Sequence, residues 1–262
     1  MCHPEVPPGT PLPNVRVDMV GIDVDGGRLP GVLALPARSP APGVLVVNDV
    51  FGQSDFYEHL TRRIAQAGFV ALDVDYFFRQ GPVATGDREA AMNRAQQLDQ
   101  LTTLDDLDRA ITWLAERPEV EGARIGTVGF CMGGTLVLDL AADRDDLATV
   151  CYYGFPARRG ENPLAPPAPL EVAERMSGPI LGHWGDQDAG VGMDNVRALD
   201  AKLTAAGVEH TFHLYPGYGH GFLKALLDDE RAEGHDQACG SWKRTLRFLR
   251  HHLGGELKDA PA

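Results

Sequence analysis

The sequence is poor in cysteine, in long apolar runs and in positive charge, and each shortage excludes a class of protein. Its four cysteines show no CxxC spacing, which argues against a disulfide framework and against a zinc site. No apolar run approaches the roughly 18 residues that cross a bilayer, and the N-terminus lacks a basic segment followed by an apolar one. We therefore expect no bound metal, no membrane partner and a cytoplasmic location.

Positive charge is scarce because 24 lysines and arginines face 37 aspartates and glutamates, for a net charge of −13. This balance disfavours nucleic acid as a partner. An anionic substrate would have to be held by local positive charge, so single arginines matter more than the net charge. The apolar content of 44% lies in the ordinary globular range, which argues against disorder.

The chain also lacks internal repeats and low-complexity linkers, so nothing in it predicts a second domain. Although 262 residues exceed the usual domain size, α/β folds often reach this length as one unit. We expect a single domain over 1–262, in which the proline-rich residues 1–14 form an irregular arm.

Hydrophobic patterning predicts strands that alternate with helices. This alternation is typical of an α/β fold with a mostly parallel sheet covered on both faces, and an N-terminal antiparallel hairpin at one edge. The expected strands are 15–24, 29–35, 44–47, 69–75, 124–129, 148–154, 179–185 and 210–215, and the expected helices are 55–67 with Ser54 as cap, 87–101, 104–116, one from Met132, 193–206 and 238–252.

One apolar run stops abruptly at Gly129-Phe-Cys131-Met-Gly-Gly. It predicts a buried strand, a tight turn at Cys131 and a helix that begins at Met132. This is the G-x-S-x-G elbow with cysteine in the serine position, where the glycines permit the sharp turn. A helix N-terminus at this point stabilises a thiolate. The alternative is a buried cysteine in a glycine-rich turn without a chemical role.

Three reactive side chains each follow an expected strand: Cys131, Asp188 and His220. Functional residues of such sheets lie beyond the carboxyl ends of the strands. The chain order of nucleophile, acid and histidine is that of α/β-hydrolases, with His220 as base and Asp188 orienting its ring. Asp186 competes with Asp188, which could be only a helix cap, and His220 could be a solvated loop residue.

Other histidines and tyrosines near the expected strand ends are weaker candidates. His183 and His213 lie within strands and are interpreted as core residues, although His183 is close enough to a strand end to line the pocket. Tyr152 and Tyr153 alternate faces, so one is expected in the core while the other reaches the site.

With these motifs, nearly the whole chain resembles the dienelactone hydrolase family. The resemblance implies an α/β-hydrolase fold and a cysteine–histidine–aspartate triad that opens an unsaturated lactone without metal or cofactor. The motifs that carry it are Gly-Phe-Cys131-Met-Gly-Gly, Tyr-Tyr-Gly at 152–154, Gly185-Asp-Gln-Asp188, Gly219-His220-Gly-Phe222, Asn48-Asp49-Val-Phe-Gly and Asp75-Tyr-Phe-Phe-Arg79-Gln.

The chain departs from the family at two positions. The family has a glutamate at position 49 that pairs with the resting thiol, and an arginine at position 224; here these are Asp49 and Lys224. Arg79 matches an arginine that binds the substrate carboxylate, although the residues alone allow a surface arginine equally well. The two changes leave the triad intact and the natural substrate open.

We therefore expect a hydrolase in which the Cys131 thiolate attacks an ester or lactone carbonyl to form a thioester, which water activated by His220 then cleaves. The backbone N–H groups of Met132 and Val50 are expected to form the oxyanion hole. A pocket suited to a small, partly apolar, anionic lactone is expected from Tyr76, Phe77, Phe78, Arg79 and Trp184. The rivals are a general carboxylesterase or thioesterase on the same triad, and a redox-sensing or non-catalytic protein that keeps the fold.

Overall fold

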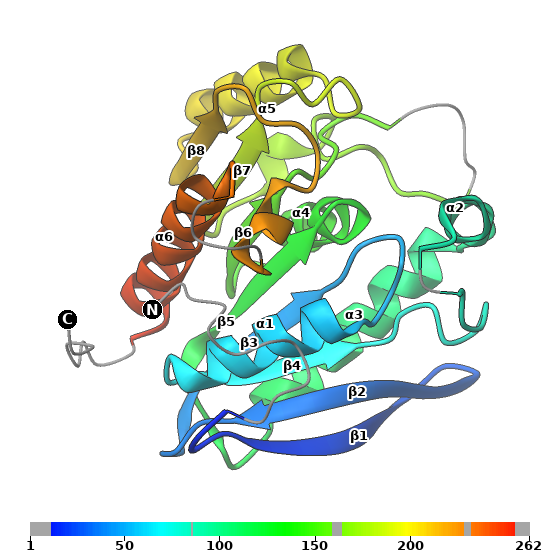
Figure 1. The fold of residues 1–262 in the computed structure, drawn as a ribbon, viewed down its shortest axis with the longest axis vertical. Coiled ribbons are helices and arrows are strands. Elements are labelled where there is room, and N and C mark those ends of the chain that lie inside the picture. Colours follow the sequence, from blue (N-terminus) through cyan, green and yellow to red (C-terminus); the bar gives the residue numbers. More distant parts are fainter. Residues whose placement is uncertain (1–11, 85, 159–163, 228–231, 255–262) are drawn as a thin grey trace.

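The computed structural model describes residues 12–84, 86–158, 164–227 and 232–254, and it places eight strands in one sheet (Figure 1). The order of strands across the sheet is β1-β2-β4-β3-β5-β6-β7-β8. The strands are β1 (Arg16–Val24), β2 (Gly27–Leu35), β3 (Ala41–Val47), β4 (Val70–Val74), β5 (Val120–Phe130), β6 (Leu147–Tyr152), β7 (Ile180–Gly185) and β8 (His210–Tyr215).

The first two strands form the expected antiparallel hairpin at one edge of the sheet. Gly26 turns the chain between them with a φ of 73°, a backbone conformation that glycine adopts without strain. β2 also pairs with β4 in the antiparallel direction, whereas all pairs from β4 through β8 are parallel. The predicted α/β-hydrolase fold with a mostly parallel sheet is confirmed.

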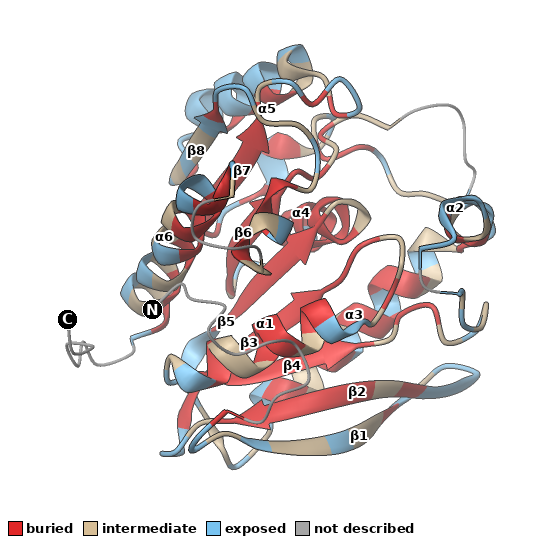
Figure 2. Ribbon diagram, in the orientation of Figure 1, coloured by how far each residue is buried: buried red, intermediate tan, exposed pale blue. Residues whose placement is uncertain are grey.

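Helices cover both faces of the sheet, as expected for strands that are apolar on both sides (Figure 2). On one face, Leu249 of α6 packs against Gly126 of β5, and Tyr57 of α1 contacts Phe130. On the other face, Leu114 of α3 packs against Gly43 of β3. The helices are α1 (Asp55–Gln66), α2 (Arg88–Gln96), α3 (Gln100–Ala115), α4 (Met132–Asp143), α5 (Met193–Ala206) and α6 (His235–Leu253), with short 3₁₀ turns η1 (Ala173–Arg175) and η2 (Phe222–Leu227).

Some helix ends differ from the predictions. The third helix begins at Gln100 and not at 104, because the Asp99 side chain accepts a hydrogen bond from the Thr102 N–H and caps it. The last helix begins at His235, three residues earlier than expected. Ser54 precedes the first helix, but its side chain makes no capping hydrogen bond. Most of the predicted arm at 1–14 lies outside the described residues.

The strand order reverses between β3 and β5, which pair in parallel. From β3 the chain moves to β4 on one side, and it later returns to β5 on the other. The loops that leave the carboxyl ends of β3 and β5 therefore meet at the switch point, which is where open α/β sheets bind their ligands. Among the described helices, none has the length and apolar character required of a membrane span.

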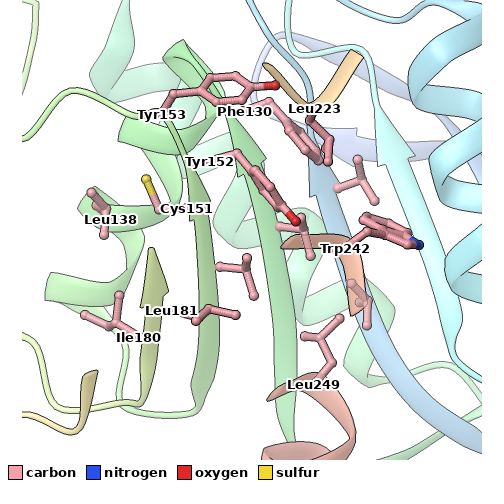
Figure 3. Close-up of a cluster of buried hydrophobic side chains, with 14 of the residues drawn as sticks. Phe130, Leu138, Cys151, Tyr152, Tyr153, Ile180, Leu181, Leu223, Trp242 and Leu249 are labelled. Carbon is pink, nitrogen blue, oxygen red and sulfur yellow. The ribbon is translucent and has the colours of Figure 1, made fainter. Parts of the chain in front are cut away.

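Beneath this edge, aromatic side chains from β5 and β6 form the core (Figure 3). Phe130 stacks on Tyr152 with ring centroids 5.2 Å apart, and Tyr152 stacks on His183 at 4.5 Å. Both His183 and Tyr152 are fully buried. The interpretation of His183 as a core residue agrees with this packing.

Candidate active site

Cys131 occupies the turn between β5 and α4 with a φ of 54° and a ψ of −117°. An L residue rarely adopts such a backbone conformation, which costs about 1–3 kcal/mol and is found mainly at functional sites. The turn also requires close packing of backbone on backbone. A Cβ added at Gly129 would overlap the carbonyl oxygen of Gly133, and a Cβ at Gly133 would overlap that of Val47. The glycines therefore hold the cysteine at the apex, where it is partly exposed.

Among the described groups, the backbone around the apex has a free donor at Met132. The Cys131 N–H donates to the Tyr152 carbonyl at 3.0 Å, whereas Met132 is the first residue of α4. The first N–H groups of a helix have no partner within it, and no side chain caps this helix. The Met132 N–H is thus available beside the thiol.

His220 and Asp188 are joined by a short hydrogen bond, with 2.6 Å between Nδ1 and Oδ2. Asp188 is almost fully buried, and its other oxygen accepts from the Val191 N–H at 3.1 Å. Asp186 instead accepts from the Gly217 N–H at 2.8 Å, which fixes a turn. The structure therefore brings Asp188, and not Asp186, to the histidine.

His220 and Asp188 each stabilise the charged form of the other. Burial lowers the pKa of His220, but its hydrogen bonds and charge interactions with Asp188 and with the Cys131 sulfur outweigh that effect and raise the pKa to about 9. Burial raises the pKa of Asp188, and the hydrogen bond from His220 reverses this and lowers it below its ordinary value. The imidazolium form is thus favoured at neutral pH, next to the sulfur.

Two aromatic rings flank the histidine. Tyr153 lies with its ring centroid 4.9 Å from that of His220, and Phe155 lies at 5.6 Å. The Tyr153 hydroxyl is buried and has no hydrogen-bond partner among the described groups. Tyr152 points into the core, where its hydroxyl lies 2.8 Å from Thr245 Oγ1. Of the two tyrosines, Tyr153 is therefore the one that reaches the site, and Phe155 was missed from the sequence.

The loop after β3, which contains Asp49 and Phe51, forms another wall of the site. The Asp49 carboxylate is nearly buried; its Oδ1 accepts from the Phe51 N–H at 2.9 Å, and Lys224 Nζ lies 3.8 Å from Oδ2. Burial raises the pKa of Tyr57 well above 10, and the neighbouring Asp49 carboxylate raises it further. Tyr57, in the first turn of α1, was not identified from the sequence; its signal was the aromatic pair that follows the loop.

The structure does not support the five expected pocket residues in that role, and Phe77 among them is fully buried. The Arg79 guanidinium forms two hydrogen bonds with the Asp106 carboxylate, donates to the Asp25 carbonyl at 2.6 Å, and stacks on Phe78. This network ties the loop after β4 to α3 and to the hairpin turn, and the adjacent Phe78 lies against Gly27. An arginine so engaged has no donor pair free for a substrate carboxylate.

Trp184 and Tyr76 are also structural residues. Trp184 is fully buried within β7 and donates from Nε1 to the Gly154 carbonyl at 2.8 Å. The Tyr76 hydroxyl donates to the carbonyls of Asn48 and Asp49 at 3.0 and 3.2 Å, and its ring is covered by the core. Both residues therefore stabilise the walls of the site from behind and do not line it.

A second arginine, missed from the sequence, contacts the loop instead. Arg94 of α2 donates from Nη2 to the Val50 carbonyl at 2.9 Å and from Nη1 to the Gly81 carbonyl at 3.0 Å. It is 7% exposed and stacks on Phe77, whose ring centroid lies 4.0 Å away. Nothing in its own helix indicates that this cation points inward.

Potential metal ligands gather elsewhere in the described part of the chain. Glu209, His251 and His252 place three ligand atoms within 4.8 Å of one another. Glu209 precedes β8, so this group lies at the amino ends of the strands, at the opposite edge of the sheet from Cys131.

Known proteins share this architecture. The model of the dienelactone hydrolase family matches residues 29–253. The chain is 30% identical to a carboxymethylenebutenolidase from Rhodococcus opacus over 243 residues, which cover 88% of this chain and 92% of that protein. It is 28% identical to a Bradyrhizobium protein assigned as a 2-oxo-3-(5-oxofuran-2-ylidene)propanoate lactonase, with 93% and 97% covered. The structure of a Klebsiella pneumoniae protein assigned to the dienelactone hydrolases matches with a TM-score of 0.80 at 27% identity, covering 90% of this chain and 98% of that one.

Proposed function

The chain belongs to the dienelactone hydrolase family and is a hydrolase that acts on a lactone or ester, and we propose that Cys131, His220 and Asp188 form its catalytic triad. The observation that carries the proposal is the strained apex at Cys131 together with the 2.6 Å bond between His220 and Asp188. A backbone conformation of this kind persists where the surrounding structure over-determines it, and the buried carboxylate holds the imidazole ring in one orientation.

In the acylation step, the Cys131 sulfur attacks the substrate carbonyl carbon while His220 carries the thiol proton as imidazolium. The carbonyl oxygen becomes an oxyanion, which the backbone N–H groups of Met132 and Val50 receive. The carbon–oxygen bond to the leaving group then breaks, and His220 protonates the departing oxygen. In a lactone that oxygen stays attached to the acyl chain, so the product of this step is a hydroxyacyl thioester.

In the deacylation step, water attacks the thioester while His220 accepts its proton. The carbon–sulfur bond breaks, the acid leaves, and the Cys131 thiolate and the His220 imidazolium are restored. Asp188 stabilises the imidazolium in both steps, because its carboxylate is buried and ionised against the ring. The side chains of this triad perform the whole cycle without a redox change.

The test is a burst experiment with an activated aryl ester, followed by mass spectrometry of the intact protein. We expect one equivalent of acyl group on Cys131, a rapid burst of phenol, and loss of both in Cys131→Ala. The matched control is Cys239→Ala, which removes a buried thiol that contacts His235 in α6. A Cys131→Ala variant that still cleaves the ester would contradict the proposed nucleophile.

A specific observation favours a second candidate, a carboxylesterase for neutral esters on the same triad. Arg79, the cation expected to hold a substrate carboxylate, is bound to Asp106 and to the Asp25 carbonyl. Lys224 remains as a half-exposed cation beside Asp49. The two candidates differ in kcat/KM for a carboxylated lactone relative to a neutral aryl ester, with a ratio well above one for the lactonase.

A further inference from the structure

The two peptide groups on either side of Val50 are both held in place by hydrogen bonds. In the first, the Asp49 carbonyl accepts from the Tyr76 hydroxyl at 3.2 Å and from the Gly52 N–H at 2.9 Å. Because a trans peptide is planar, with its N–H opposite its carbonyl, this arrangement directs the Val50 N–H away from Tyr76. No described group accepts from the Val50 N–H, which therefore remains available.

The second peptide is fixed by Arg94. The Val50 carbonyl accepts from Arg94 Nη2 at 2.9 Å, and the Phe51 N–H of the same peptide donates to Asp49 Oδ1 at 2.9 Å. Hydrogen bonds to the peptide before Val50 and to the peptide after it thus fix the orientation of this residue. Loss of the hydrogen bonds on either side allows the backbone at Val50 to rotate.

Arg94 itself is held rigidly enough to serve as an anchor. Its other terminal nitrogen donates to the Gly81 carbonyl at 3.0 Å, and Phe77 supports the flat face of the guanidinium. Gly52 has a φ of 78°, and a Cβ at this position would lie 3.2 Å from Arg94 Nη2, so the loop is closely fitted to the cation. A planar fork of donors can reach two carbonyls at once, whereas a lysine offers a single point of charge.

The same loop lies directly against the elbow. A Cβ at Gly133 would overlap the carbonyl oxygens of both Val47 and Asn48, so the backbone after β3 touches the first turn of α4. The Val50 N–H and the Met132 N–H therefore belong to two backbone segments in contact. A rotation of the backbone at Val50 changes the distance between the Val50 N–H and the Met132 N–H without moving the Cys131 thiol.

We propose that Arg94, assisted by Tyr76, is a positioning residue for hydrolysis that aims the Val50 N–H at the oxyanion. This inference rests on the proposed function, since it assumes that Cys131 is the nucleophile. It assigns to a buried arginine in α2 a role in stabilising the transition state through the backbone that it holds. Arg94 does not touch the substrate, because its side chain is covered by the loop and by Phe77.

The test compares two reactions of Cys131 in the full-length protein. Acylation by p-nitrophenyl acetate passes through an oxyanion, whereas alkylation by iodoacetamide displaces iodide without one. In Arg94→Lys we expect the burst rate of acylation to fall about 10- to 100-fold, since loss of an oxyanion donor lowers rates by about 10²–10³-fold. The alkylation rate should stay within about twofold. The matched control is Arg158→Lys, which alters a partly buried arginine bound to Asp139 and to the Pro166 carbonyl.

Tyr76→Phe provides a second, smaller change at the other end of the Val50 peptide, so the inference stays testable where Arg94→Lys fails to fold. It removes one oxygen atom and should also slow acylation more than alkylation. Equal slowing of both reactions in these variants, or an unchanged acylation rate, would overturn the inference. Absence of an acylation burst in the wild-type protein would instead contradict the proposed function.

Discussion

Lys224 Nζ lies 3.8 Å from Asp49 Oδ2, so the two residues that the resemblance sets apart from the family pattern are in contact. The shorter acid is turned toward the lysine and toward the Phe51 N–H, which Oδ1 accepts at 2.9 Å. The two differences are thus one local arrangement, and both bear on which substrates the site accepts.

Lys224→Met should weaken the binding of anionic substrates selectively. The ammonium group is half-exposed and, among the described residues, is the cation nearest to Asp49, so we expect it to bind a substrate carboxylate. We expect KM for a carboxylated lactone to rise about fivefold at low salt, and this difference to shrink at high salt because exposed charges are screened. KM for a neutral aryl ester should stay within about twofold. Steady-state kinetics at two ionic strengths check this, and an equal rise for both substrates would contradict it.

Asp49→Glu should make the resting cysteine less reactive. The added methylene extends the carboxylate by about 1.5 Å, and the resemblance implies that a glutamate here reaches the thiol. In the wild-type protein the sulfur interacts with His220 instead, so iodoacetamide should alkylate it readily at neutral pH. We expect the alkylation rate of Asp49→Glu to fall several-fold, as measured by mass spectrometry of the modified peptide. A variant that is alkylated as fast as the wild type would show that the carboxylate does not reach the sulfur.

Arg79→Gln should reduce stability more than it changes substrate preference. The substitution leaves the buried Asp106 carboxylate without its cation, which we expect to lower the free energy of unfolding by about 2–3 kcal/mol. The ratio of kcat/KM for a carboxylated lactone and a neutral ester should remain within about twofold. Urea unfolding and paired kinetics check both expectations. A selective loss of activity on the anionic substrate would contradict this prediction and show that Arg79 binds the substrate carboxylate.

The bond between His220 and Asp188 should make stability depend on pH in a defined window. The folded pKa of His220 is about 9, above its ordinary value of 6.5, so folding favours the protonated ring. This contribution to stability is fully present below pH 6.5 and is lost as the pH rises through about 9. Asp188→Asn removes the carboxylate, and the gap in unfolding free energy between wild type and variant should narrow across that window. Urea unfolding at pH 6 to 10 measures it, and parallel curves would contradict the assignment.

Much of the fold could be predicted because the signals are local. The elbow at Cys131 is a contiguous glycine pattern, and Asp188 and His220 each follow an apolar run that ends abruptly. Parallel strands bring such loops to one edge, so proximity follows from topology alone. The start of α3 could not be predicted in this way, because Asp99 caps the helix at a point that hydrophobic spacing does not mark.

The partners of individual side chains could not be predicted, since they depend on contacts far apart in sequence. Arg79 meets Asp106, which lies 27 residues further along the chain. Trp184 lies in a strand that is covered on both faces, so alternation does not indicate which of its residues reach the site. Arg94 reaches Val50 across 44 residues, from a helix with few apolar positions to orient it.

The strained backbone at Cys131 lowers the thermal stability of the protein at the position where we propose that the nucleophile lies. A glycine there would release about 1–3 kcal/mol of conformational strain, while its greater freedom in the unfolded chain would take back about 0.5–1 kcal/mol. Cys131→Gly should therefore melt a few degrees higher than the wild type while being inactive. We therefore expect the proposed nucleophile to be a residue that makes the folded protein less stable than glycine would at the same position. Selection for thermal stability alone would replace Cys131.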